Sequence, residues 1–415
     1  MLGNSISTTQ AKVFFLTFMC MVAAHASREA WYMIKPDLQL YMGFDSTYLG
    51  AIDTTFLFLY SMGYYSSGIL ADKFKPTSIL AIGMSIGMVA LWLVSIFGIL
   101  QCTEKLPYLI FWALEGPAQG CILTTSAAVM GNWFPSSIRG KIMGIWGSNA
   151  SVGNIFGEWI AAFVLETMHL PWQAVMLVVA TFLGCAGIST RLSIEDKPHH
   201  INIDPLRPKP PSLSFWAAWK VQGVLLCALC YGCVKLLNYG FLMWLPFYLQ
   251  NSYGMSFTKI GFLATLYDIG AITGSVMAGF LSDKFRFRSA IVEIMLVLSI
   301  PVVMMFRVID SEMMWFYYIL SPCAGYMIGG SANIISTAIA ADLSIDNTTK
   351  ESRATIIGII NGTGSLGAAS GQIFIGWLQT FSWSYVFLFL VLVAAFATVA
   401  MLPIVYQEWQ KRKTE

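Results

Sequence analysis

Residues 68–74 read Gly-Ile-Leu-Ala-Asp-Lys-Phe, and residues 279–285 read Gly-Phe-Leu-Ser-Asp-Lys-Phe, 211 positions later. A second pattern recurs after 214 positions: Arg139, Gly144, Ser151, Gly153 and Gly157 reappear as Arg353, Gly358, Ser365, Gly367 and Gly371. Both offsets are about half of the 415-residue chain. Two separate repeats at nearly the same offset predict two homologous halves in parallel orientation.

The composition is typical of a membrane protein. Hydrophobic residues make up 57% of the chain and charged residues only 11%, whereas soluble domains carry about 25% charged residues. Apolar runs of about 20 residues can span a bilayer as helices. Such runs are expected at residues 13–35, 47–70, 77–99, 107–132, 140–165, 171–190, 219–249, 256–281, 288–307, 313–340, 354–377 and 383–406. We therefore predict an all-α polytopic membrane protein with twelve transmembrane helices in two six-helix, pseudo-symmetric halves.

The two halves are expected at residues 1–191 and 215–415, the second ending in a basic tail. The segment 192–214 between them is polar and rich in proline, so we interpret it as a cytoplasmic linker. With both termini in the cytoplasm, 18 Lys and Arg residues face the cytoplasm and four face outward. This bias agrees with the positive-inside rule and fixes the expected orientation.

Two cations lie inside apolar segments, Arg28 in the first half and Lys235 in the second. A cation in hydrocarbon costs several kcal/mol, about 2.5–3.5 on insertion scales, so such residues normally face a water-filled cavity and act there. Their matching positions in the two halves predict one anionic ligand held by both. A purely structural ion pair at Arg28 remains an alternative.

Polar neighbours share a helical face with each cation. His25, Tyr32 and Lys35 lie on the face of Arg28, and Asn238 and Tyr239 follow Lys235 by three and four residues. For Lys35, a side chain that reaches outward to the membrane edge is an equally good interpretation.

Several other functions are not indicated. The formal net charge is only +2, and the basic residues are dispersed among loops, so no nucleic-acid surface is expected. Cys227, Cys230 and Cys233 share helical spacing, but no His or acid accompanies them nearby, so no metal site is predicted. With no evident nucleophile or nucleotide-binding loop, we expect neither an enzyme nor a cofactor; a membrane enzyme is a remote alternative.

The repeated Gly-x-Leu-Ala/Ser-Asp-Lys-Phe segment resembles the loop signature of the major facilitator superfamily. Within that superfamily, three further segments resemble solute carrier family 37: Gly131-Asn-Trp-Phe134, Trp244-Leu-Pro-Phe-Tyr248 and Asn361-Gly-Thr-Gly-Ser365. These are the sugar-phosphate exchangers of the organophosphate:phosphate antiporter group. The similarity runs from about residue 25 to residue 407, nearly the whole chain.

This resemblance implies roles for particular residues. It implies that Arg28 binds phosphate and that Lys235 is the second cation. The further substrate-binding candidates are Tyr32, Lys35, Tyr60, Asn149, Asn238, Tyr239 and Asn361. Charge-balancing or coupling roles are expected for Asp53, Glu115 and Asp268, although a helix-end network is an alternative for Asp53 and Asp268. The repeated loops would supply gating residues: Asp72, Lys73, Asp283 and Lys284.

Three positions depart from the family pattern. Glu29 stands where a lysine is common, Glu115 where relatives often have asparagine, and Asn149 lies in a stretch that has a histidine in many members. These changes point to an altered substrate or to a proton-linked step. An intramembrane glutamate is a candidate proton relay, but Glu115 can equally be a neutral, hydrogen-bonded group.

We expect a monomeric transporter that exchanges a phosphorylated sugar or glycerol, such as glucose 6-phosphate or glycerol 3-phosphate, for inorganic phosphate. Two alternatives stay open: a proton-coupled transporter of another organic anion, and a sugar-phosphate sensor without transport. The chain ends Lys411-Arg412-Lys413-Thr414-Glu415, which fits a K-x-K-x-x retrieval signal and favours the endoplasmic reticulum membrane. An ordinary basic tail explains the same residues.

Overall fold

The computed structural model describes residues 7–198, 215–309, 311–339, 343 and 353–414. These residues form helices and connections, with no strand among them. The helices from the first half of the chain are α1 (Thr8–Met42), α2 (Ser46–Lys73), α3 (Pro76–Ile99), α4 (Lys105–Trp133), α5 (Ser136–Trp146), α6 (Asn149–Ala162), η1 (Phe163–Thr167) and α7 (Trp172–Ser193). Those from the second half are α8 (Phe215–Trp219), α9 (Val224–Tyr253), α10 (Phe257–Phe285), α11 (Arg288–Val308), η2 (Ser311–Phe316), α12 (Tyr317–Ala324), η3 (Gly325–Gly329), α13 (Gly330–Ile334), η4 (Ile335–Ile339), α15 (Arg353–Gln379) and α16 (Trp383–Thr414).

The helices confirm the predicted all-α membrane architecture. Within the described ranges, seven helices are long and apolar enough to cross a bilayer: α1, α3, α7, α9, α10, α11 and α16. The other expected spans correspond to α2, α4 and α15 and to two interrupted helices. The span expected at 140–165 is broken between α5 and α6 at Gly147 and Ser148. The span expected at 313–340 alternates between α-helical and π-helical turns. Hydropathy does not report such local changes in winding.

The chain folds into two compact units, residues 1–44 with 58–206 and residues 45–57 with 207–415. The first part of α2 therefore groups with the second unit. Ser46 Oγ donates a hydrogen bond to the Gly376 carbonyl, and Thr54 Oγ1 donates one to the Ala369 carbonyl, each over 2.9 Å. The linker expected at 192–214 lies outside the described residues from position 199 onward.

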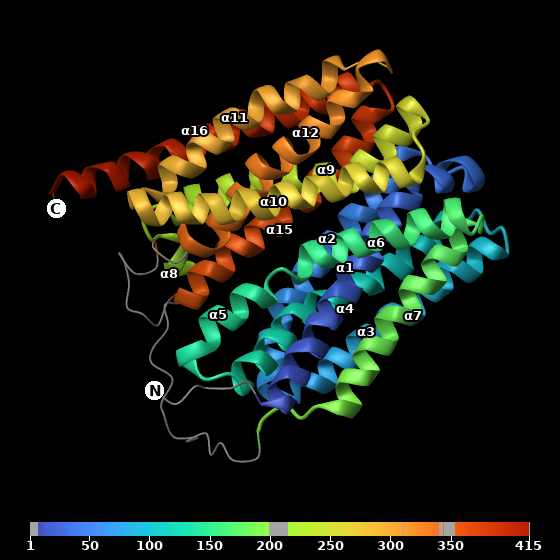
Figure 1. Ribbon diagram of the computed structural model, residues 1–415, viewed down its shortest axis with the longest axis horizontal. Coiled ribbons are helices and arrows are strands. Elements are labelled where there is room, and N and C mark those ends of the chain that lie inside the picture. The colour runs from blue at the N-terminus through green and yellow to red at the C-terminus, as the bar shows by residue number, and fades with distance from the viewer. Residues whose placement is uncertain (1–6, 199–214, 310, 340–342, 344–352, 415) are drawn as a thin grey trace. The chain divides into compact units, whose positions relative to one another are not determined.

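Each unit repeats the same set of helix contacts (Figure 1). In the first unit α1 packs on α6 and α3 packs on α7, and in the second α9 packs on α15 and α11 packs on α16. The pairs correspond in chain order. The packing thus repeats the internal symmetry that the two sequence motifs predicted.

One helix crossing shows the repeat at the level of backbone atoms. A Cβ on Gly63 of α2 would lie 2.5 Å from the carbonyl oxygen of Pro117 in α4. In the second unit, Gly270 of α10 meets the carbonyl of Pro322 in α12 in the same way. Only a residue without a side chain permits such a close backbone approach. Both crossings therefore require glycine.

An acidic side chain caps the third membrane helix of each half. Asp196 Oδ1 accepts a hydrogen bond of 2.7 Å from the amide of Thr77 at the start of α3. Glu408 of α16 accepts bonds of 3.0 and 2.9 Å from the amides of Arg288 and Ser289 at the start of α11. A carboxylate at a helix N-terminus satisfies free amides and complements the helix dipole. The basic residues Lys411, Arg412 and Lys413 form the last turn of α16, and their use as a retrieval signal stays a prediction.

Candidate substrate-binding site

Arg28 lies in a buried polar cluster of the first unit. Its side chain is 5% exposed, and its Nη2 lies 2.8 Å from Nδ1 of His25, one turn earlier in α1. Because a guanidinium only donates, Nδ1 of His25 accepts this bond. Oδ1 of Asn154 on α6 lies 3.1 Å from the same Nδ1, and because both atoms are acceptors while Arg28 donates to Nδ1, this contact is not a second hydrogen bond. The ring centre of Tyr60 on α2 lies 5.7 Å from Arg28 Cζ. The guanidinium thus contacts side chains of α1 and α2, and α6 packs against its partner His25.

Lys35 is fully buried, at 0% exposure, and its Nζ lies 5.1 Å from the ring centre of Tyr32. A lysine that reached the membrane edge would expose its amine, so the burial argues against that interpretation. Tyr32 itself is 2% exposed. Both residues therefore belong to the interior of the first unit, on the same helix as Arg28.

Lys235 is the centre of a corresponding cluster in the second unit. Its Nζ donates a hydrogen bond of 2.8 Å to Ser365 Oγ on α15. The ring centres of Tyr239 and Tyr231 lie 5.6 and 5.9 Å from the amine, a distance at which aromatic faces stabilise a cation. The cation is therefore held between α9 and α15.

The other predicted residues of the second unit have different surroundings. Asn238 Oδ1 accepts a hydrogen bond of 2.8 Å from the hydroxyl of Tyr267 in α10. The amide of Asn361 donates to the Ile357 carbonyl of its own helix at 3.0 Å. Asp268 and Asp53 are buried, at 3% and 2% exposure.

The remaining predicted residues are less central. The amide of Asn149 donates to the Trp146 carbonyl across the break between α5 and α6, over 2.5 Å. Lys284 is exposed at the end of α10, 5.7 Å from the ring centre of Phe285. The side chains of Asp72, Lys73 and Asp283 lie outside the described part of the chain. Their gating role stays a prediction.

Four partners of the predicted residues were missed by the sequence analysis: Asn154, Tyr231, Tyr267 and Ser365. Asn154 and Ser365 lie within the glycine-rich repeat, and Tyr231 precedes Lys235 by four residues, so helical spacing was an available signal. Tyr267 lies on a different helix from Asn238, and no local pattern connects them. Glu158 of α6, 1% exposed, is a further buried acid that was missed.

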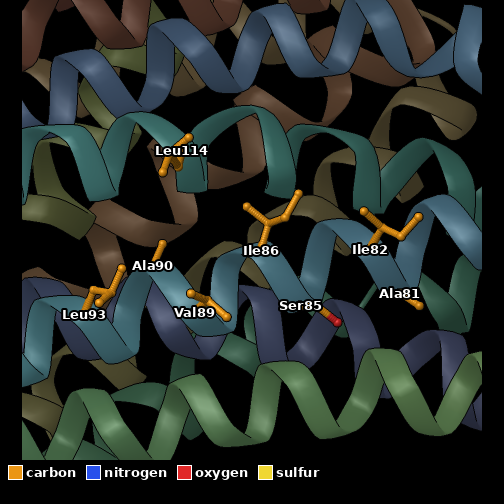
Figure 2. A pocket seen from close by; sticks show the side chains of 8 residues that line it. All are labelled: Ala81, Ile82, Ser85, Ile86, Val89, Ala90, Leu93 and Leu114. Atoms are coloured by element: carbon orange, nitrogen blue, oxygen red, sulfur yellow. The ribbon is translucent and has the colours of Figure 1, made fainter.

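A groove on the first unit is a poor candidate for an anion site. Figure 2 shows the eight side chains that line it, seven from α3 and Leu114 from α4. Its volume is about 450 Å³, and Ser85 is the one polar residue of the lining. Ile82 is 61% exposed and Val89 48% exposed. An apolar, exposed face on a spanning helix is suited to lipid chains rather than to a charged solute.

Comparison with known proteins identifies the family. Residues 13–344 match the family model described as Major Facilitator Superfamily. The chain belongs to this superfamily. The major facilitator fold also appears in solved structures: the bacterial homologue of the human lysosomal transporter Spinster, in an inward-facing and unoccupied conformation, has a TM-score of 0.77 at 14% identity, over 96% of this chain and 98% of that one. The nucleoside transporter NupG has a TM-score of 0.74 at 14% identity, over 96% and 99%.

Curated relatives place this major facilitator protein more narrowly. Sugar phosphate exchanger 3 of Homo sapiens is 30% identical over 461 residues, covering 95% of this chain and 92% of the relative. Putative glycerol-3-phosphate transporter 2 of Arabidopsis thaliana is 31% identical over 450 residues, covering 97% and 88%. The predicted membership of solute carrier family 37 is thereby confirmed. The protein is a multi-pass membrane protein of a transporter family.

Proposed function

We propose that this protein exchanges a phosphorylated sugar or glycerol for inorganic phosphate across a membrane, by alternating access. The names of its curated relatives, sugar phosphate exchanger and glycerol-3-phosphate transporter, support the organophosphate as substrate. The observation that carries the proposal is the pair of cations inside apolar helices, the buried Arg28 in one unit and the half-buried Lys235 in the other, each held by polar or aromatic side chains.

The chemistry of the two cations suits a phosphoryl group. A guanidinium offers a planar set of donors to two phosphate oxygens and stays charged in any environment. An ammonium group supplies a compact charge with three donors. Aromatic rings lie near both cations: the ring centre of Tyr60 is 5.7 Å from Arg28 Cζ, and that of Tyr239 is 5.6 Å from Lys235 Nζ.

The direct test is exchange of radiolabelled phosphate in proteoliposomes loaded with phosphate, with glucose 6-phosphate and glycerol 3-phosphate as competitors. We expect Arg28→Ala and Lys235→Ala each to lower exchange about ten- to a hundredfold, since a charge-assisted phosphate contact contributes about 1.5–3 kcal/mol. Arg28→Lys should retain part of the activity because the charge remains.

The controls are basic residues outside the two clusters. Arg191→Ala removes an exposed arginine at the end of α7 that bonds Ser78 Oγ over 3.1 Å, and Lys259→Ala removes an exposed lysine near the start of α10. Both should exchange phosphate like the wild type. A folded wild type that exchanges no phosphate would contradict the antiport, and full activity of Lys235→Ala would remove that residue from the site.

A further inference from the structure

Glu115 is a carboxylic acid at the centre of the first unit. It lies in α4 and is 0% exposed. Its Oε1 accepts a hydrogen bond of 2.5 Å from Nε2 of Gln119, which also donates to Ser27 Oγ of α1 over 2.9 Å. Among the described residues, Oε2 of Glu115 has no hydrogen-bond partner. One oxygen of a buried acid is therefore left without a donor.

The neighbouring helices leave room for this carboxyl, and α1 brings the charge of Arg28 to act on it. A Cβ on Gly87 of α3 would collide with Oε2 of Glu115, and it would lie 2.9 Å from Leu183 of α7. Gly87 and Leu183 carry no charge. Arg28 of α1 is the charged group whose electrostatic interaction acts on Glu115 within the described structure, beside the hydrogen bond from Gln119. The acid and the proposed phosphate-binding arginine are thus electrostatically linked.

The second half of the chain provides an internal comparison. The crossing at Pro117 and Gly120 recurs at Pro322 and Gly325, an offset of 205 positions. At that offset Glu115 corresponds to Leu320 and Gln119 to Ala324, which are 3% and 0% exposed. The same crossing therefore forms with two apolar side chains. Packing of the helices does not require an acid at position 115.

A buried carboxyl group has two stable states. It is ionised when a nearby cation offsets its charge, and it is protonated when that cation is neutralised. An anion that binds Arg28 competes for the charge that Glu115 uses. We propose that Glu115 is a proton-binding site, which takes up one proton from water as an anion binds Arg28 and releases it as the anion leaves.

This inference rests on the proposed function, because it assumes that phosphate or an organophosphate binds at Arg28. No covalent bond other than the O–H bond of the acid forms or breaks. A proton that accompanies each anion in both directions leaves one-for-one exchange without net proton movement. The linkage appears instead in affinity: anion binding should tighten as pH falls.

The test is equilibrium binding of radiolabelled phosphate and glycerol 3-phosphate to the purified full-length protein between about pH 6 and pH 8. For the wild type we expect the Kd to change by up to about tenfold per pH unit more than for Glu115→Gln, since one linked proton gives that slope. The glutamine has the shape of the protonated acid but does not titrate. Both anions also titrate within this pH range, the phosphate monoester near pH 6, and the comparison of the two proteins cancels this contribution.

Two further variants sharpen the comparison. Glu115→Leu copies Leu320 and should show the same reduced slope as Glu115→Gln. Glu293→Gln changes a partly buried acid of α11, whose Oε2 also lacks a hydrogen-bond partner in the described structure, and should keep the wild-type slope. Equal slopes for the wild type and Glu115→Gln, with both binding phosphate, would overturn the proton site alone. A folded wild type that binds neither anion at any pH would overturn the proposed function and this inference together.

Discussion

Lys235 donates a hydrogen bond of 2.8 Å to Ser365, so α15 holds the cation of α9 in place. Ser365 Oγ in turn lies 3.2 Å from the Asn361 carbonyl, to which it donates. The hydroxyl is therefore oriented with its lone pairs toward the amine. The serine hydroxyl is neutral, so we expect it to act by positioning Lys235 and not by binding the anion itself.

Replacement of this serine should weaken anion binding without unfolding the protein. A hydrogen bond to a charged group contributes about 1.5–3 kcal/mol. Only the part of this free energy that orients the amine affects the anion, so we expect Ser365→Ala to raise the Kd for phosphate roughly tenfold. Ser370→Ala is the matched control, because Ser370 is an exposed serine of the same helix whose hydroxyl donates to the Gly367 carbonyl at 2.9 Å. Equal Kd values for the two variants would contradict the positioning role.

His25 should orient Arg28 in a similar way. Loss of the acceptor in His25→Ala is expected to raise the Kd for phosphate about fivefold, since the guanidinium gains rotational freedom. His25→Asn places a carbonyl oxygen near the position of Nδ1 and should retain most of the affinity. Scintillation proximity binding of labelled phosphate measures both. An asparagine variant as weak as the alanine variant would show that the ring, not the acceptor, matters.

The glycine at the helix crossing should not tolerate a methyl group. Gly63→Ala places Cβ 2.5 Å from the Pro117 carbonyl oxygen, so α2 and α4 must separate, at a cost of about 1–3 kcal/mol. Gly131→Ala is the control, because its Cβ meets nothing within 4 Å, and alanine in a helix is about 1 kcal/mol better than glycine. Thermal unfolding in detergent, followed by tryptophan fluorescence, should shift down for Gly63→Ala and slightly up for Gly131→Ala.

The cap on α11 should contribute to stability of the second unit. Glu408→Ala removes the acceptor for the amides of Arg288 and Ser289 and for the Ser289 hydroxyl. Loss of a helix cap costs about 1–2 kcal/mol, and we expect a matching decrease in the thermal midpoint. Gln410→Ala, an exposed position two residues later, should leave the midpoint unchanged. Retained stability of Glu408→Ala would mean that water replaces the cap.

The membrane helices could be predicted because hydropathy is a local property of the sequence. The interruption at Gly147 and Ser148 could not, since an isolated glycine is also tolerated inside membrane helices. The sequence identified Arg28 and Lys235 because a cation in an apolar run is conspicuous. It did not identify Ser365 as the hydrogen-bond partner of Lys235, or Gln119 as the partner of Glu115. These contacts depend on how the helices rotate and pack. Asn361 was predicted as a substrate-binding residue, but its side-chain amide donates to a backbone carbonyl of its own helix. Residue spacing alone does not reveal that the backbone competes with a ligand for this donor.

The matching helix crossings at Pro117 and Pro322 also bear on how the two halves of the chain arose. Two copies of one crossing within a single chain are what duplication of a half-length segment produces. The backbone contact has stayed the same in both copies, whereas positions 115 and 320 now hold an acid and a leucine. Such divergence is possible in a single chain, because a change in one half does not appear in the other. The Glu115→Leu variant has leucine at both positions. It should keep the fold, with the two halves more alike, and lose the acid.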